Sequence, residues 1–262
     1  MSVKMEDVKR LREITGAGMS DCKNALVAAN GNVDDAIMAL QKSGLAASDA
    51  RSGRTTAEGR VFIKNDTEKS IVNVAIVKCE TDFVANNKDF AALGEADNLG
   101  AAVDKLKVSM RENIKIDTES MVGYDPNTDV VGTYVHSDNK SGAVVIISGA
   151  KDKDRAKVFA KDCCLHLVAF TPLYTNKESV PESYISEKTE IFKAQMDNDP
   201  KMTTKPENVR EGILKGKINK HLAEICFMEQ TFVKDDHATV KQMLLRECGD
   251  TAIIKVAKLF TL

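Results

Sequence analysis

The chain has 262 residues, of which 43% are hydrophobic and 29% are charged, as is ordinary for a soluble globular protein. Its formal net charge of −2 excludes a general electrostatic attraction to nucleic acid or to an anionic membrane. Residues 1–10 lack the apolar core of a signal peptide and no apolar run is long enough to span a membrane, so we expect a cytoplasmic protein.

Residues 1–45 predict a unit of three short helices. The first helix has an apolar face and ends before the glycine-containing turn at 15–18, because glycine permits positive φ. A second helix follows from about Ser20, and a third runs from its capping residue Asn32 to Gly44. The next stretch is rich in Gly, Ala and Ser without a hydrophobic period, and we interpret residues 46–56 as a linker.

The middle of the chain contains two similar segments whose residue numbers differ by 73. Residues 59–63 align with 132–136, and residues 71–74 align with 144–147. Each copy predicts two strands followed by a helical stretch, roughly at 87–106 and 152–170, and a two-stranded hairpin needs such a cover. A third strand is expected at 113–116 in the first copy and at 251–260 in the second.

The fold class predicted from this order is α+β. After the three-helix module come two related antiparallel sheet-plus-helix subdomains, at 57–130 and at 131–180 with 226–262. Between the two parts of the second subdomain, residues 181–225 predict two helices. Pro206 suits the start of the second, which carries apolar residues at helical spacing. Their short link favours an antiparallel helical hairpin.

No enzyme motif is present, neither a phosphate-binding loop nor a nucleophile elbow nor a zinc-protease motif. Cys163 and His166 have a spacing that two metal ligands could use, but no further ligand pair accompanies them, which favours a buried cysteine and a satisfied or partner-facing histidine. A nucleophilic Cys163 or Cys164 lacks a base nearby. We expect no catalytic residue, no metal and no cofactor. The six cysteines read as small buried hydrophobic residues in a reducing compartment.

Residues 78–86 follow the second strand of the first copy and contain Asp82 and Phe83. A phenylalanine in such a loop is more often a plug in its own core than an exposed contact, and the aspartate is usually a cap or a solvated charge. From the residues alone, both interpretations of Phe83 remain open.

Two long motifs resemble the signatures of the elongation factor Ts family. They are LREITGAGMSDCKNAL at residues 11–26 and CETDFVA at residues 79–85. Shorter matches occur at 57–59, 211–217 and 229–234, so the resemblance spans nearly the whole chain in the family's order.

The resemblance implies a guanine nucleotide exchange factor that binds elongation factor Tu and accelerates its loss of GDP. It implies that the three-helix module is similar to a ubiquitin-associated domain. The Asp-Phe pair would enter the GTPase near its magnesium and phosphate site. The implied partner-binding residues are Thr81, Asp82, Phe83, Val84, Arg12, Met19 and His166. The region of Phe232 and Val233 would meet the partner elsewhere.

Two positions depart from the family's usual pattern. Ser20 stands where many members have a second methionine, and Thr231 stands where many have proline. These departures concern the strength of the contacts and leave Asp82 and Phe83 intact. Two other classes compete: a module that binds a ubiquitin-like partner, and an enzyme that uses Cys163, Cys164 or His166. We expect no direct nucleic acid or membrane partner, and the sequence leaves a homodimer open.

Overall fold

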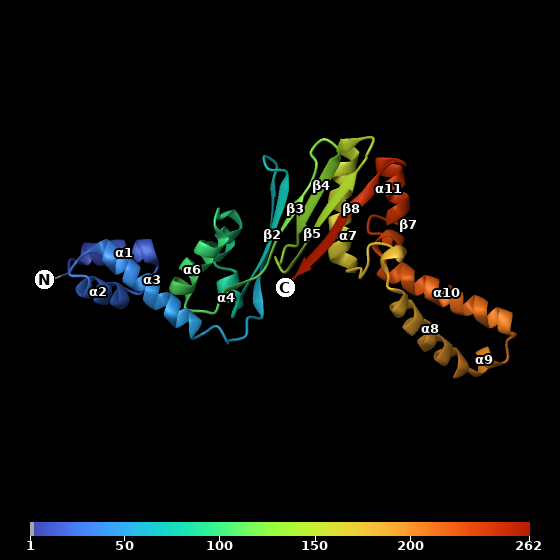
Figure 1. Ribbon diagram of the computed structural model, residues 1–262, viewed down its shortest axis with the longest axis horizontal. Coiled ribbons are helices and arrows are strands. Elements are labelled where there is room, and N and C mark those ends of the chain that lie inside the picture. The colour runs from blue at the N-terminus through green and yellow to red at the C-terminus, as the bar shows by residue number, and fades with distance from the viewer. Residues whose placement is uncertain (1–2) are drawn as a thin grey trace. The chain divides into compact units, whose positions relative to one another are not determined.

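The computed structural model describes residues 3–262, except for the side chains of residues 45–49. The chain forms two compact units (Figure 1). Unit 1 comprises residues up to Gly123 together with Val135–Gly142 and Phe260–Leu262, and unit 2 comprises Tyr124–Tyr134 and Ala143–Leu259. As the sequence predicts, the architecture mixes three N-terminal helices with small antiparallel sheets. The finer division into a module, a linker and subdomains stays a prediction.

Unit 1 begins with the helices α1 (Met5–Thr15), α2 (Met19–Ala28) and α3 (Val33–Asp49). Gly16 ends α1 with φ of 68°, in the left-handed conformation expected for the turn. Asn32 caps α3 by accepting the backbone N–H groups of Asp34 and Asp35. A small core joins the three helices, and Leu11, Cys22, Leu26 and Ala36 are fully buried in it.

The prediction that the third helix ends at Gly44 is wrong, since α3 continues to Asp49 and takes in the first part of the expected linker. A Cβ on Gly44 would lie 2.6 Å from the side chain of Val108 on α6 (Leu99–Met110). The glycine therefore permits close packing of two helices rather than a stop. The alanine-rich residues that follow favour continuation of the helix.

The first sheet has the order β1-β2-β3, built from β1 (Glu58–Asp66), β2 (Ile71–Cys79) and β3 (Lys115–Gly123). Both pairs are antiparallel, and the register of β2 against β3 shifts at Ile76/Val77. The helical stretch predicted at 87–106 is divided into α5 (Lys88–Ala91), the 3₁₀ turn η1 (Ala92–Glu95) and α6, because Asn98 caps α6. These helices cover one end of the sheet around the buried Phe90.

The second sheet has the order β4-β5-β8, built from β4 (Asp129–Val135), β5 (Ser141–Ser148) and β8 (Ile253–Thr261). The prediction that the end of the chain supplies the third strand is confirmed. The helices α7 (Lys153–Phe170) and α11 (Val240–Cys248) pack on this sheet around Ile147 and Cys163. Directly before α11 in the sequence, the chain forms the 3₁₀ turn η3 (Phe227–Glu229) and a small sheet of two strands, β6 (Thr231–Phe232) and β7 (Asp235–Thr239).

The two helices predicted at 181–225 are α8 (Glu182–Asp197) and α10 (Glu207–Ile225), with the 3₁₀ turn η2 (Lys177–Ser179) before them and the single turn α9 (Pro200–Thr203) between them. Figure 1 shows α8 and α10 side by side. They run antiparallel, because Tyr184 near the start of α8 bonds His221 near the end of α10 at 3.0 Å, and Asp197 pairs with Arg210 at the other end. Within residues 3–262, no helix is long and apolar enough to cross a membrane.

Candidate functional site

The strongest candidate site is the four-residue helix α4 (Asp82–Ala85), which lies between β2 and α5. Phe83 on this helix is 85% exposed, the highest value among the exposed large hydrophobic residues of the described chain. The next two residues, Val84 and Ala85, are buried in the core of unit 1. Of the two interpretations of Phe83, the structure excludes the core plug and leaves the outward-facing ring.

Both ends of α4 are held by hydrogen bonds. At the start, Thr81 is the N-cap, and its Oγ1 accepts the backbone N–H of Val84 at 3.4 Å. At the end, Arg60 on β1 donates from Nε to the carbonyl of Ala85 at 2.6 Å and from Nη2 to Asn86 at 3.3 Å. A positive side chain is favourable at the C-terminal end of a helix, where carbonyls are unpaired. The helix that carries the exposed ring is therefore held in place at both ends.

Asp82 is exposed in the first turn of α4, where a negative charge interacts favourably with the free N–H groups. A lysine lies within electrostatic range of it. Lys140 bonds Glu58 at 2.7 Å, and this bond raises the pKa of Lys140, with smaller contributions from the carboxylates of Asp138 and Asp82. The surface beside Phe83 is thus charged, and the ring is an apolar projection within it.

The predicted docking residues of the three-helix unit flank one turn. Arg12 is exposed on α1, and its carbonyl accepts the backbone N–H of Gly16 at 2.7 Å. Met19 begins α2 on the other side of the turn and is half-buried against the core of the three helices. Both residues remain accessible at the surface of unit 1.

His166 lies in the interior of unit 2 and is fully buried, so its side chain has no free surface to offer. Its Nε2 and the Oε1 of Gln230 share a 2.9 Å hydrogen bond, and its Nδ1 accepts the backbone N–H of Val233 at 3.1 Å. The ring stacks on Phe170 at a centroid distance of 4.7 Å. Burial lowers the pKa of His166, which favours the neutral ring that this pattern of bonds requires.

The structure thus brings Thr81, Asp82 and Phe83 together at the surface of α4, and it buries Val84 and His166. A buried Val84 anchors α4, while His166 supports the half-exposed Phe170 and Val233. The sequence reasoning missed two residues that hold the α4 region, Arg60 and Glu112. Neither residue belongs to a recognisable motif, and both lie far in the sequence from the residues of the α4 region that they bond.

The cysteines do not form a reactive site. All six are buried and free. Burial raises the pKa of Cys164 to about 12 and raises that of Cys163 well above the usual value, so neither is a thiolate at neutral pH. The described residues contain no group of three or more His, Cys, Asp or Glu side chains that could hold a metal ion.

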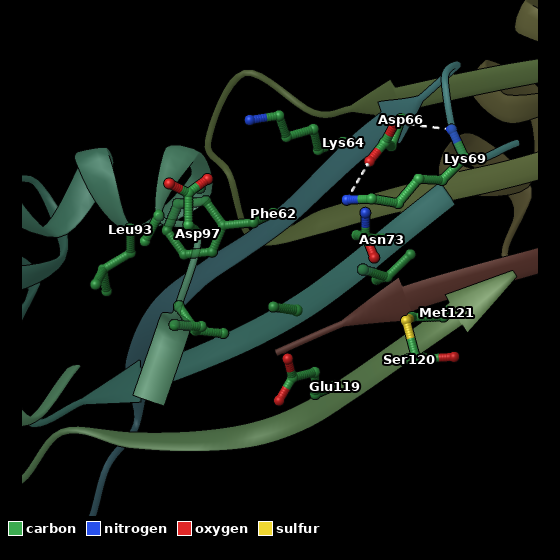
Figure 2. A pocket seen from close by; sticks show the side chains of 15 residues that line it. Phe62, Lys64, Asp66, Lys69, Asn73, Leu93, Asp97, Glu119, Ser120 and Met121 are labelled. Carbon is green, nitrogen blue, oxygen red and sulfur yellow. Dashed lines mark hydrogen bonds and ion pairs between the residues drawn. The ribbon is translucent and has the colours of Figure 1, made fainter. Parts of the chain in front are cut away.

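A hollow of about 250 Å³ lies on the first sheet where its helical cover ends (Figure 2). Phe62 and Leu93 line the covered end, and Lys64, Asn73 and Glu119 line the open part of the sheet face. Asp66 and Lys69, which also line the hollow, form an ion pair (Figure 2). None of the predicted site residues lines this hollow, so it is separate from the surface of α4.

Comparisons with known proteins bear on the whole chain. The family model described as elongation factor TS matches residues 95–260. A protein of Treponema denticola named elongation factor Ts is 41% identical over all of this chain and 99% of its own length. The chain belongs to the elongation factor Ts family. Two further relatives carry the same name. The protein from Borrelia duttonii is 37% identical over 93% of this chain and 92% of its own length. The protein from Clostridium acetobutylicum is 31% identical over 95% of this chain and 88% of its own length.

The family model begins after Phe83, whereas the Treponema denticola relative aligns along the entire chain. Membership therefore does not depend on the CETDFVA motif. It confirms the family that the two motifs indicated, and it leaves the part played by each site residue to be tested.

Proposed function

We propose that this protein is the guanine nucleotide exchange factor for elongation factor Tu, and that it promotes GDP release by inserting Asp82 and Phe83 beside the magnesium and phosphate site of the GTPase. One observation carries the proposal: the ring of Phe83 is 85% exposed on a short helix whose next two residues, Val84 and Ala85, are buried and whose ends are held by hydrogen bonds. The elongation factor Ts name of the relatives supports a role in translation elongation.

Such a factor makes and breaks no covalent bond. By linkage, a protein that binds the nucleotide-free GTPase more tightly than the GDP-bound form must weaken GDP binding by the same factor. A factor of about 10³ requires about 4 kcal/mol of coupling, at roughly 1.4 kcal/mol per tenfold. No catalytic residue is needed for this, and we propose that the protein is not an enzyme in the usual sense.

Phe83 supplies apolar area and Asp82 supplies charge. In a GTPase, Mg²⁺ and the backbone amides of the phosphate loop hold the diphosphate. A ring pressed into an apolar slot beside that site shifts the elements that hold the metal and the phosphates, and fully burying a phenylalanine contributes about 1.5–3 kcal/mol. The carboxylate of Asp82 competes for donors near the cation or repels phosphate.

The remaining predicted residues serve docking and support. Arg12 and Met19 dock the three-helix unit, which we take as similar to a ubiquitin-associated domain, on the GTPase. Thr81 caps α4 and Val84 anchors it, while His166 holds the surface formed by Phe170 and Val233 for a second contact.

We extend the proposal to the architecture and the setting. The two three-stranded sheets with their covering helices represent related subdomains, and the hairpin of α8 and α10 is an insertion in the second. The protein acts in the cytoplasm on elongation factor Tu, without direct contact with nucleic acid or membrane, in keeping with its net charge of −2.

Stopped-flow release of fluorescent GDP from purified elongation factor Tu tests the function. We expect this chain to raise the release rate in a saturable manner. A release rate that does not change at any concentration of the chain would refute the proposal. The alternative, an interaction module for a ubiquitin-like partner, predicts that negative outcome. In a pull-down it also predicts no nucleotide-linked retention of a GTPase.

A further inference from the structure

Glu112 connects the start of β3 to the loop that carries the candidate site. It follows Arg111, the left-handed C-cap of α6, and its carboxylate reaches the loop between β2 and α4. Oε2 accepts the backbone N–H groups of Glu80 and Thr81, both at 3.1 Å, and Oε1 accepts the hydroxyl of Thr81 at 2.6 Å. All three donors belong to the two residues that directly precede Asp82.

The contact is reciprocal. Oε1 of Glu80 accepts the backbone N–H of Asn113 at 2.7 Å, so each segment bonds the backbone of the other through a carboxylate. Asn113 is buried, and its amide nitrogen donates to the carbonyls of Ser52 at 3.0 Å and Arg54 at 2.8 Å. Arg54 also pairs with Glu80 at 3.4 Å. The loop is therefore tied to two other segments of unit 1.

These bonds hold the segment that leads into α4. A helix of four residues is too short to be stable without external contacts. The N–H groups of Glu80 and Thr81 lie beyond the paired part of β2 and before the helix, so the carboxylate of Glu112 is their partner. It also orients the hydroxyl of Thr81, the N-cap. Charge-assisted bonds of this kind are about twice as strong as neutral ones.

We propose that Glu112 is a positioning residue for nucleotide exchange, which holds the Glu80–Thr81 loop so that α4 presents Phe83 outward in one direction. Its effect on exchange rests on the proposed function above. Its effect on the order of α4 does not, and the two can be measured separately.

The order of α4 is measured on the free protein. The chain contains no tryptophan, so Phe83→Trp introduces a single tryptophan, whose emission can be excited apart from that of the four tyrosines, at the exposed position. In this background, Glu112→Ala should increase the amplitude of nanosecond depolarisation in time-resolved anisotropy. Glu119→Ala is the matched control, because Glu119 is an exposed glutamate on β3 of the same unit. Equal anisotropy decays in Phe83→Trp, Phe83→Trp/Glu112→Ala and Phe83→Trp/Glu119→Ala would overturn the proposal.

The exchange assay supplies the second measurement. Glu112→Ala should lower the maximal GDP release rate about tenfold, since small misplacements of an acting group have effects of this order, while the half-saturating concentration stays the same. The double variant Phe83→Ala/Glu112→Ala should be no slower than Phe83→Ala alone, because Glu112 acts through Phe83. Losses that multiply in the double variant would overturn the proposal, since a purely structural role gives that result.

Conservative variants keep the test decisive if Glu112→Ala folds poorly. Glu112→Gln retains the shape and one acceptor and should give an intermediate loss of rate. Thr81→Ser keeps the hydroxyl that Glu112 accepts and Thr81→Val removes it, so Thr81→Val should lose more of the release rate than Thr81→Ser. Identical rates for Thr81→Ser and Thr81→Val would count against the bond. If the unsubstituted chain promotes no exchange, the proposed function fails, and the anisotropy experiment still judges Glu112.

Discussion

Replacing Phe83 with alanine separates stability from the proposed function, because the ring is 85% exposed. A surface substitution of this kind changes the free energy of unfolding by about 0.5 kcal/mol or less. In a complex that buries the ring fully, its contribution is about 1.5–3 kcal/mol. If that contribution is made only when GDP has left, its loss slows GDP release by roughly ten- to hundredfold, at about 1.4 kcal/mol per tenfold.

Phe90 provides the matched control for this prediction. It lies in the same unit on α5, it is fully buried, and its ring centroid is 6.3 Å from that of Phe62. Phe90→Ala should lower the free energy of unfolding by about 3–5 kcal/mol through the loss of core contacts and the cavity left behind. The two alanine variants therefore remove the same side chain with opposite consequences.

The assay is stopped-flow release of fluorescent GDP from purified elongation factor Tu at saturating concentrations of each variant, with denaturant unfolding as the measure of stability. We expect Phe83→Ala to unfold like the unsubstituted protein and to lose most of its maximal rate. If a fully folded Phe83→Ala variant releases GDP at the unsubstituted rate, the reasoning from the exposed ring is wrong.

Three further predictions concern other parts of the chain. Arg12→Ala and Met19→Ala should each raise the concentration needed for half-maximal exchange and leave the maximal rate within about twofold, as a titration of the release rate would reveal. Burial opposes ionisation of Asp129, but hydrogen bonds led by that from Lys255 lower its pKa to about 2. The resulting stabilisation is complete above the usual pKa of 3.8 and is lost as the pH falls toward 2. Over this pH range, the free energy of unfolding measured in urea should fall by up to about 2 kcal/mol less in Asp129→Asn than in the unsubstituted protein. Because burial lowers the pKa of His166, unfolding free energy should fall as the pH drops below 6.5, and His166→Leu should flatten this dependence in denaturant titrations.

Most strands of the two sheets were predictable because apolar residues recur along them, although the third strand of the first copy, expected at 113–116, is β3 at Lys115–Gly123. The apolar run at 143–147 forms the interior of β5, and the end of the chain supplies β8 as expected from the second copy. Helix ends were harder. Gly44 carries the signal of a helix stop, yet α3 continues past it, and a Cβ at this position would clash with Val108, which lies 64 residues further along the chain. Close packing between distant segments leaves no local pattern in a single sequence.

The candidate site was only partly predictable for the same reason. The motif CETDFVA indicated where α4 would lie, but alternation and spacing could not decide whether Phe83 points inward. The bracing side chains Arg60 and Glu112 bond residues 25 to 32 positions away in the sequence. Likewise, the burial of His166 depends on Phe170 of its own helix and on Gln230 and Val233 of a distant segment, so its sequence neighbours alone did not reveal it.

The exposed ring is better explained by a partner than by the stability of the chain. Phe83 removes little apolar area from water in the free protein, and a polar residue at the same place would leave the buried anchors Val84 and Ala85 unchanged. Arg60 donates to the carbonyl at the end of α4, and Glu112 accepts from the two residues that precede the helix. Hydrogen bonds that order a short helix reduce the entropy lost when its exposed residue is later buried. A preorganised aromatic projection therefore favours an interaction in which Phe83 enters a pocket of another protein.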